Sequence, residues 1–378
     1  MTSVEPFVLH RSDEELTDLR HRLEAARWPE PETVDDWSQG VPLAKIQELC
    51  DYWRDGYDWR RCEAMLNGFG QYRTEIEGLG IHFLHIRSPE PDALPLVMTH
   101  GWPGSVVEFH KVIRPLTDPA AFGGNPRDAF HLVLPSLPGF GFSDKPSRKG
   151  WTVGRIARAW VELMERLGYE RFVAQGGDWG AAVATALGHL APPQLIAIHL
   201  NMPIAFPDTA GMADWTAEEK AAAAEFQRFA DEETGYSTQQ RTRPQTLGYG
   251  LADSPIGQAA WIYEKYCAWT DCGGDPSNVF SFDEMLDNIM LYWLPAAGAS
   301  SARLYWESMH SFQTEPIHVP TGCSKFPKEV MRPSRRWAER TYPNIVYWNE
   351  LDRGGHFAAF EQPELFIDEI RACFRQFR

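Results

Sequence analysis

The segment from residue 172 to 180 carries the residue best placed to act as a nucleophile. It reads FVAQGGDWG, so a strand-like run leads into Asp178, with Gly176 and Gly180 on either side and a helix-like run after it. This spacing is typical of a nucleophile elbow, a turn too sharp for bulky flanking residues. A carboxylate is ionised at neutral pH and is favoured at a helix N-terminus, so Asp178 would attack an sp3 carbon without a base and form an alkyl-aspartyl ester. The alternative is a glycine-rich turn in which Asp178 only caps a helix.

A second turn could hold the oxyanion of such a reaction. His100–Ser105 (HGWPGS) directly follows a strand-like run. In an elbow fold, the loop after that strand supplies one N–H donor and the residue after the nucleophile supplies the other. The predicted donors are therefore the backbone N–H groups of Trp102 and Trp179. A plain Pro–Gly turn would also explain the breaker residues, although not their position after a strand.

A histidine near the end of the chain is the candidate general base. His356 follows Gly354 and Gly355, between the last strand-like run and the last helix-like run. The acid that orients it should lie between nucleophile and histidine in the chain, on a loop that reaches the far imidazole nitrogen. We prefer Glu329, because its separate loop can approach that side. Asp352, four residues before His356, stays open as the alternative acid, and a solitary core or surface histidine is the other interpretation.

These side chains require a scaffold in which strands alternate with helices. The predicted strands, bounded by turn residues, are Ile81–Ile86, Leu94–Thr99, His131–Leu134, Phe172–Ala174, Ile196–Leu200, Ile317–Val319 and Asn344–Trp348. The predicted helices that separate or follow them are Val153–Leu167, Ala181–Leu190 and Glu364–Phe377. This alternation indicates the α/β class, with a mostly parallel sheet and helices on both of its faces.

Two stretches depart from the alternation. The N-terminal part is helical, since Ser12 and Glu15 form a capping-box pattern and apolar residues follow at helical spacing. Residues 207–313 are rich in helix formers and aromatic residues, which predicts a helical insert in the sheet. We therefore expect four parts: an N-terminal helical extension (1–74), the first part of the core (75–206), a helical cap (207–313) and the second part of the core (314–378).

Composition narrows the classes of partner. The chain has 378 residues, a formal net charge of −16 and a sequence pI of about 5.2, and such an acidic surface repels nucleic acid and anionic membranes. The six cysteines form no C-x-x-C pair or metal-ligand cluster, so we expect reduced, mostly buried thiols, no metal and no cofactor. With no signal-peptide pattern and no long apolar stretch, a soluble, cytoplasmic protein is expected. The oligomeric state stays open, with a homodimer as one alternative.

Several longer motifs occur together along nearly the whole chain. They are QYRTEIEGLGIHFLHIRS (71–88), HGWPGS (100–105), PSLPGFGFS (135–143), GGDWG (176–180), PTGCSKFPKE (320–329) and RGGHFAAFEQPEL (353–365). Together they resemble the epoxide hydrolases of the α/β-hydrolase superfamily, specifically the microsomal-type branch. The resemblance implies the α/β-hydrolase fold, with Asp178 as nucleophile, His356 as base and Glu329 as orienting acid. Membrane-bound relatives carry an N-terminal anchor, which we do not expect here. The resemblance therefore implies a similarity to soluble bacterial members, some of which act in secondary-metabolite pathways.

The resemblance also implies two cap tyrosines that donate hydrogen bonds to the epoxide oxygen. In the family, one lies in a Gly-Tyr segment before a T-R/K-P motif, and Tyr236 matches it ahead of Thr242–Pro244. The other lies in a helix shortly before the core resumes, and Tyr305 in SARLYWE matches it. Other tyrosines of the cap leave the second position less well defined: Tyr249, Tyr263, Tyr266 and Tyr292.

The sequence therefore predicts an enzyme that converts an epoxide and water to a vicinal diol through an ester on Asp178. Trp102, Trp179, Tyr236 and Tyr305 are also the predicted substrate-binding residues. A haloalkane dehalogenase could use the same aspartate, but the tyrosine pair and HGWPGS favour an epoxide. A non-catalytic binding protein of this fold would be expected to lack a triad residue. The 15 Trp, 21 Phe and 12 Tyr residues weakly favour a bulky apolar or aryl substrate.

Overall fold

A single twisted sheet forms the centre of the computed structural model, which describes residues 3–311, 313 and 315–378. Within these residues the sheet has nine strands in the order β1-β2-β3-β5-β4-β6-β7-β8-β9. They are β1 (Glu5–Phe7), β2 (Gln71–Ile76), β3 (Leu79–Ile86), β4 (Leu94–Thr99), β5 (Phe130–Pro135), β6 (Phe172–Gly176), β7 (Leu195–Leu200), β8 (Thr321–Lys325) and β9 (Ile345–Glu350). Neighbours from β5 to β9 pair in parallel, whereas β1, β2 and β3 pair antiparallel with one another and β3 does so with β5.

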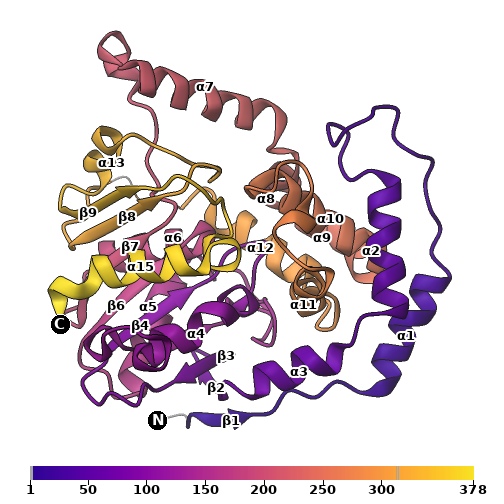
Figure 1. Cartoon of the computed structure of the whole chain (residues 1–378), viewed down its shortest axis with the longest axis horizontal. Coiled ribbons are helices and arrows are strands. Elements are labelled where there is room, and N and C mark those ends of the chain that lie inside the picture. The colour runs from indigo at the N-terminus through magenta and orange to yellow at the C-terminus, as the bar shows by residue number, and fades with distance from the viewer. Residues whose placement is uncertain (1–2, 312, 314) are drawn as a thin grey trace.

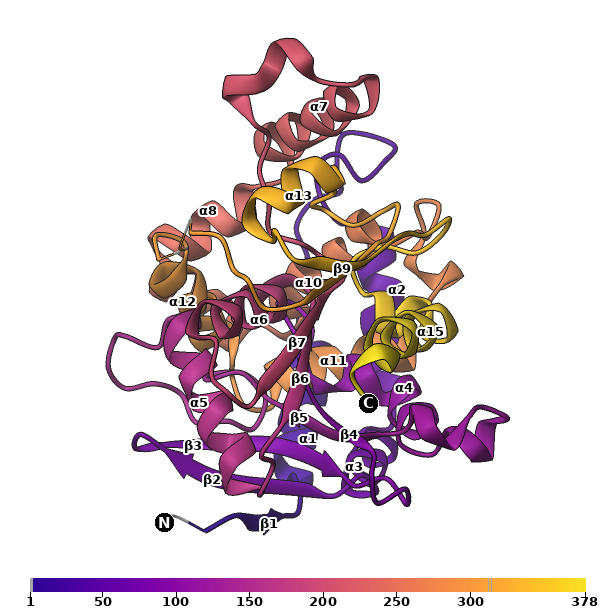
Figure 2. The same ribbon diagram turned by 90° about the vertical axis from the view of Figure 1, so that its left-hand side faces the viewer.

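Helices cover both faces of the parallel part. Figure 2 shows α5 (Val153–Arg166) and α6 (Asp178–Leu190) on one side of the sheet, and α4 (His110–Thr117) and α15 (Pro363–Phe374) on the other. The central strands are accordingly apolar and fully buried, as in the run Leu96–Met98. The predicted α/β class with a mostly parallel sheet is confirmed.

Among the described residues, six α-helices lie between β7 and β8 in the chain. They are α7 (Ala217–Glu232), α8 (Gly235–Thr242), α9 (Pro244–Asp253), α10 (Pro255–Trp269), α11 (Phe282–Trp293) and α12 (Gly298–Ser308). Figure 1 shows α8 to α12 gathered to one side of the sheet, whereas α7 runs apart from them above α13 (Arg335–Thr341). The helices fit the predicted insert, and the four-part division of the chain stays a prediction.

The N-terminal part packs on these inserted helices. Its helices are α1 (Asp13–Glu24), α2 (Leu43–Asp55) and α3 (Trp59–Asn67), and α1 begins with the predicted capping box of Ser12 and Glu15. The side chain of Asp287 on α11, only 3% exposed, receives hydrogen bonds from Tyr57 at 2.8 Å and from Arg61 at 2.6 Å. A buried carboxylate needs such partners, so this contact fixes the N-terminal helices to α11. The same part also supplies β1 and most of β2, which the predicted helical extension lacked.

One predicted strand is wrong. Ile317–Val319 is not a strand, and the strand of that region is β8, a few residues later. The sequence of β8, TGCSK, lacks large apolar side chains because α15 lies very close to it: a Cβ on Gly322 would be 2.2 Å from the sulfur of Cys373. Ile317 instead packs against Gly188 of α6, where an added Cβ would lie 2.5 Å from its Cδ1 atom.

Two expectations from composition can be compared with the structure. All six cysteines are free thiols, and five of them are buried, as predicted. In residues 3–311, 313 and 315–378, no helix combines the length and the apolar character that crossing a membrane requires.

Candidate active site

Asp178 lies at the turn from β6 into α6, as the first residue of the helix. Its φ of +49° lies in the left-handed region, which L residues other than Asn and Asp rarely adopt. The turn is possible because its neighbours are glycines. A Cβ on Gly176 would lie 2.1 Å from the carbonyl of Gly180, and one on Gly180 would lie 1.8 Å from the carbonyl oxygen of Thr99. The sharp turn presents the carboxylate at the helix N-terminus with 15% of the side chain exposed.

The loop after β4 contacts this carboxylate directly. The backbone N–H of Trp102 donates to Oδ1 of Asp178 at 2.7 Å. The approach requires glycine at position 101, because a Cβ on Gly101 would lie 2.3 Å from Oδ1 of Asp178. Trp102 and Pro103 are joined by a cis peptide bond. One predicted oxyanion donor therefore already points at the predicted nucleophile.

Helix α11 holds this loop in place. The side-chain amide of Asn288 donates to the carbonyl of Pro103 at 2.7 Å, and the hydroxyl of Tyr292 donates to the carbonyl of Gly104 at 2.7 Å. Both donors are buried. The position of the Trp102 N–H group thus depends on an inserted helix far from it in sequence.

Two loops at the carboxyl ends of β8 and β9 bring an acid to the histidine. A β-bridge joins Lys328 to Gly355, and the N–H of Lys328 donates to the carbonyl of Gly354 at 3.0 Å. As a result, Nδ1 of His356 lies 2.6 Å from Oε1 of Glu329, whose side chain has no exposed surface. The other ring nitrogen, Nε2, lies 3.5 Å from Oδ2 of Asp178. Asp178, His356 and Glu329 thus form one connected array.

Asp352 lies outside this array. Its side chain is 81% exposed, and its carboxylate is 3.9 Å from the guanidinium of Arg353. The two glycines before His356 direct the chain inward instead: Gly354 has a φ of +96°, and a Cβ on Gly355 would lie 2.5 Å from the carbonyl of Trp269. That carbonyl also accepts the backbone N–H of His356 at 2.8 Å. Of the two predicted acids, the structure brings only Glu329 to the histidine.

Opposing effects act on the pKa of His356. Burial alone would lower it, but the negative charges of Glu329 and Asp178 outweigh burial and hold the pKa well above its usual value. Converting Asp178 to a neutral ester would remove one of these charges. The pKa of His356 should therefore fall when the ester has formed, which leaves more of the neutral base.

The two predicted cap tyrosines meet over the elbow. The ring of Tyr236 on α8 stacks on Trp102 at 5.0 Å with an interplanar angle of 8°. Tyr305 on α12 lies edge-on to Trp179 at 4.7 Å and to Trp102 at 5.8 Å. Burial is the main reason that the pKa of both hydroxyl groups is raised. The negative charge of Asp178 raises the pKa of Tyr236 and of Tyr305 further. Both phenols therefore stay neutral and can donate hydrogen bonds.

The other tyrosines considered from the sequence have different surroundings. Tyr249 is 70% exposed, and Tyr292 donates to the loop after β4. Tyr263 packs edge-on against Trp37 at 5.6 Å, and Tyr266 packs against Phe357 at 5.0 Å. Tyr236 and Tyr305 are thus the pair whose rings cover Trp102 beside Asp178.

A small cavity behind the array contains polar residues that the sequence analysis did not select. Its volume is about 20 Å³, enough for one water molecule, and its lining includes Asp178, His356, Glu108, Gln175 and Asn201. Burial raises the pKa of Glu108 to about 8, with the nearby His356 acting against this shift. The side-chain oxygen of Gln175 is buried with no hydrogen-bond partner in the part of the chain that the structure describes. An acidic residue inside the apolar run VVEF was the only sequence signal for Glu108.

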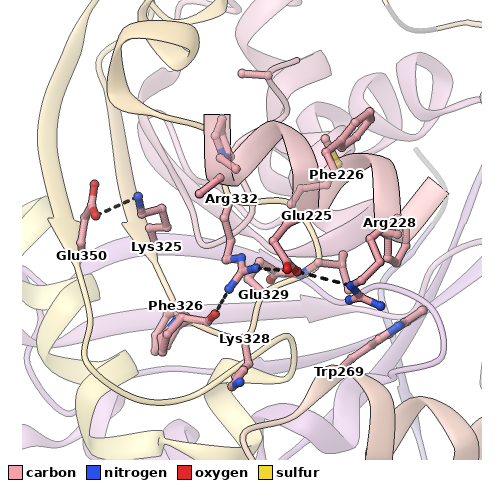
Figure 3. A pocket seen from close by; sticks show the side chains of 18 of the residues that line it. Glu225, Phe226, Arg228, Trp269, Lys325, Phe326, Lys328, Glu329, Arg332 and Glu350 are labelled. Atoms are coloured by element: carbon pink, nitrogen blue, oxygen red, sulfur yellow. Dashed lines mark hydrogen bonds and ion pairs between the residues drawn. The ribbon is translucent and has the colours of Figure 1, made fainter. Parts of the chain in front are cut away.

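A larger cavity of about 490 Å³ opens between α7 and residues 325–333. Figure 3 shows Trp269 and Glu329 among the residues that line it. Arg332, three residues after Glu329, reaches Glu225 of α7 at 3.4 Å. The segment that carries Glu329 is therefore tied to α7 by an ion pair, which no local pattern in the sequence indicated.

Comparison with known proteins shows that this chain is similar to epoxide hydrolases. Residues 4–109 match the family model "Epoxide hydrolase N terminus", and residues 95–246 match that of the alpha/beta hydrolase fold. A Stigmatella aurantiaca protein assigned by name to the epoxide hydrolases is 61% identical over 376 residues, covering 99% of this chain and 86% of that protein. Epoxide hydrolase 1 of Oryctolagus cuniculus is 36% identical over 399 residues, covering 97% of this chain and 88% of the rabbit protein.

Solved structures of epoxide hydrolases are also similar to this chain over its whole length. The structure of Aspergillus niger epoxide hydrolase is 34% identical, with a TM-score of 0.89, and the match covers 100% of this chain and 97% of that one. The crystal structure of juvenile hormone epoxide hydrolase from the silkworm Bombyx mori is 30% identical, with a TM-score of 0.91 and coverage of 100% and 95%.

Proposed function

The chain belongs to the epoxide hydrolases of the α/β-hydrolase fold, and from this premise we propose that it forms the diol through a covalent ester on Asp178. The family's reaction, an epoxide and water giving a vicinal diol, is the activity of this enzyme. The observation that carries the mechanism is the position of the Asp178 carboxylate. One oxygen, Oδ1, is held by the N–H of Trp102 at 2.7 Å, and the other, Oδ2, faces Nε2 of His356 at 3.5 Å.

In the first step, Oδ2 of Asp178 attacks one epoxide carbon. The new C–O bond forms as the bond from that carbon to the epoxide oxygen breaks, and the electron pair passes to the epoxide oxygen. Tyr236 and Tyr305 donate hydrogen bonds to this developing alkoxide. One of the two phenols passes its proton to the alkoxide and regains a proton from water. Both rings lie over Trp102 next to the nucleophile, and both hydroxyls are kept protonated by burial and by the charge of Asp178.

In the second step, His356 removes a proton from water, and the resulting hydroxide attacks the carbonyl carbon of the ester. The negative charge develops on Oδ1, where the N–H groups of Trp102 and Trp179 stabilise it. Glu329 keeps the imidazole oriented through Nδ1, at 2.6 Å. When the intermediate collapses, the C–O bond to the substrate breaks, the leaving oxygen takes the proton held by His356, and the diol is released. Asp178 retains the oxygen that came from water and loses its proton to solvent, which restores the carboxylate.

The small cavity beside the array supplies a place for this water. It touches both Asp178 and His356, and the unpaired oxygen of Gln175 offers a hydrogen-bond acceptor there. Glu108, with its pKa raised to about 8, is protonated at neutral pH and can donate to the same molecule. We therefore assign the hydrolytic water to this cavity.

The wall of the site favours an apolar epoxide. Trp102, Trp179, Trp269, Tyr236 and Tyr305 lie in mutual ring contact around the nucleophile. Aromatic walls bind apolar or aryl groups well. The relatives described above are epoxide hydrolases, so the haloalkane dehalogenase and the non-catalytic binding protein are set aside.

The activity is tested by incubating the enzyme with styrene oxide and, separately, with a haloalkane. We expect styrene diol and no halide release. Asp178→Ala should abolish diol formation, whereas the matched control Asp352→Ala should keep it, because Asp352 is 81% exposed and outside the array. Alanine in the left-handed conformation costs about 1 kcal/mol, so thermal unfolding must show that the Asp178 variant is folded. Near-normal diol formation by a folded Asp178→Ala variant would rule out the covalent mechanism.

A further inference from the structure

A buried ammonium group lies beside the proposed hydrogen-bond donors. Lys265 belongs to α10 and is only 2% exposed. Its Nζ atom forms an ion pair with Glu264 at 2.7 Å, and the carboxylate side chain of Glu264 is itself 30% exposed. Lysine is almost never buried to this extent unless it is paired. The ion pair with Glu264 therefore places the ammonium group next to residues that the proposed mechanism uses.

The ammonium group is directed at aromatic rings of the site. Nζ of Lys265 lies 4.5 Å from the ring centroid of Tyr236 and 5.4 Å from that of Trp269. Both distances are within the range of a cation–π contact, which is stronger where water is excluded. Because Lys265 and Trp269 are four residues apart on α10, they share one helix face, and Tyr236 packs on Trp269 at 5.1 Å. The positive charge is thus a direct neighbour of the Tyr236 ring.

The charges around Tyr236 differ in their effect on its hydroxyl. The carboxylates of Asp178, Glu264 and Glu233 all oppose negative charge on the phenol oxygen. When an epoxide opens, negative charge develops on the epoxide oxygen and is shared with the phenol that donates to it. A cation held against the phenol ring stabilises that charge and acts against the effect of these carboxylates.

We propose that Lys265 is a positioning residue that strengthens Tyr236 as the hydrogen-bond donor to the developing alkoxide. Lys265 does not touch the substrate and acts through the ring of Tyr236. The inference rests on the proposed donor role of Tyr236. It places the effect of Lys265 in the alkylation step alone, since hydrolysis of the ester uses His356 and Glu329 instead.

The competing explanation is purely structural. Lys265 also contacts Trp269, whose carbonyl accepts the backbone N–H of His356 at 2.8 Å. If Lys265 only held Trp269 in place, its loss would disturb His356, and ester hydrolysis would slow at least as much as alkylation. The two steps must therefore be measured separately.

The test is a double-mutant cycle in single-turnover experiments with styrene oxide. Alkylation and ester hydrolysis are followed by rapid quench and intact-protein mass for the wild type, Lys265→Met, Tyr236→Phe and the double variant. We expect Lys265→Met to slow alkylation about tenfold and to leave hydrolysis unchanged. In the Tyr236→Phe background the same substitution should have almost no further effect, because the residue through which it acts is gone.

Further variants keep the result interpretable. Lys265→Arg should retain most of the alkylation rate, since it keeps the charge, and Lys220→Met on the exposed side of α7 should match the wild type. Should Lys265→Met fail to fold, Lys265→Gln takes its place in the cycle.

An unchanged alkylation rate in Lys265→Met, an equal loss in both backgrounds, or an equal loss in hydrolysis would each overturn the inference. If Tyr236→Phe alone left alkylation unchanged, the donor role of Tyr236 would fall first and Lys265 would fall with it.

Discussion

Replacing Glu329 with glutamine tests how the base is oriented. The substitution keeps the shape of a side chain that has no exposed surface and lies 2.6 Å from Nδ1 of His356. It removes the charge that does most to raise the pKa of His356, and the new amide can present its NH2 group to Nδ1 and so favour the wrong tautomer. Loss of the orienting carboxylate in a triad of this kind costs up to about 10⁴-fold in rate. We expect ester hydrolysis to slow by about 10²–10⁴-fold.

Alkylation should be far less affected, because Asp178 attacks the epoxide without a base. Single-turnover mixing with styrene oxide, followed by intact-protein mass spectrometry, should show an ester that forms quickly and decays slowly. The matched control is Asp352→Asn, which removes an exposed carboxylate and should stay within about twofold of the wild type. A stalled ester in Asp352→Asn, or a Glu329→Gln enzyme with normal ester decay, would refute this assignment of the acid.

Three further predictions concern the other members of the site. His356→Gln should consume one equivalent of epoxide per enzyme and then stop, as an ester that peptide mapping places on Asp178; continued turnover would contradict its role as base. Tyr305→Phe should slow alkylation by about 10²-fold, the usual cost of losing one oxyanion-type donor. The control Tyr249→Phe changes an exposed tyrosine and should leave the alkylation rate unchanged. Equal alkylation rates for the two variants would remove Tyr305 from the mechanism. Since His356 must be neutral to act as a base, the rate of ester decay should fall as the pH drops through the pKa that His356 has in the ester. NMR titration should give His356 a higher pKa in the resting enzyme than in the ester, because Asp178 still carries its charge there. An equal or lower pKa in the resting enzyme would contradict this coupling.

Short-range sterics explain why part of the site could be predicted from the sequence. Gly176 and Gly180 flank Asp178 because the turn leaves no room for a Cβ, so the elbow is visible in five consecutive residues. Before His356, Gly354 has a positive φ and Gly355 lies against the carbonyl of Trp269, so both positions require glycine. Positions fixed by backbone crowding thus appear as local motifs.

Which acidic residue lies next to His356 depends on how two loops are arranged. Glu329 and Asp352 are both plausible from their place in the chain, and only the bridge between Lys328 and Gly355 decides which one faces His356. Such pairing is not encoded in either loop alone. The tyrosine pair could be selected only through the family resemblance, since Tyr236 and Tyr305 lie in helices without a distinctive local pattern.

Other features depended on long-range packing. β8 was misplaced because small residues fill it where α15 lies close, a contact with Cys373 that local hydrophobicity does not report. Lys265 looks like an ordinary surface residue of a helix until α8 is packed against it. Glu108 becomes notable only when the turn after β4 directs its carboxyl group toward the cavity behind Asp178.

The origin of the oxygen in the first product tests the covalent mechanism most directly. Wild-type enzyme in excess over an epoxide is mixed in ¹⁸O water, so that each molecule turns over once, and the diol and the peptide containing Asp178 are analysed by mass spectrometry. If Oδ2 of Asp178 attacks the epoxide, the first diol carries unlabelled oxygen from the protein, and the label enters the carboxylate of Asp178 during ester hydrolysis. A first-turnover diol that carries solvent label, with an unlabelled Asp178, would show that water attacks the epoxide directly and that Asp178 serves only as a base.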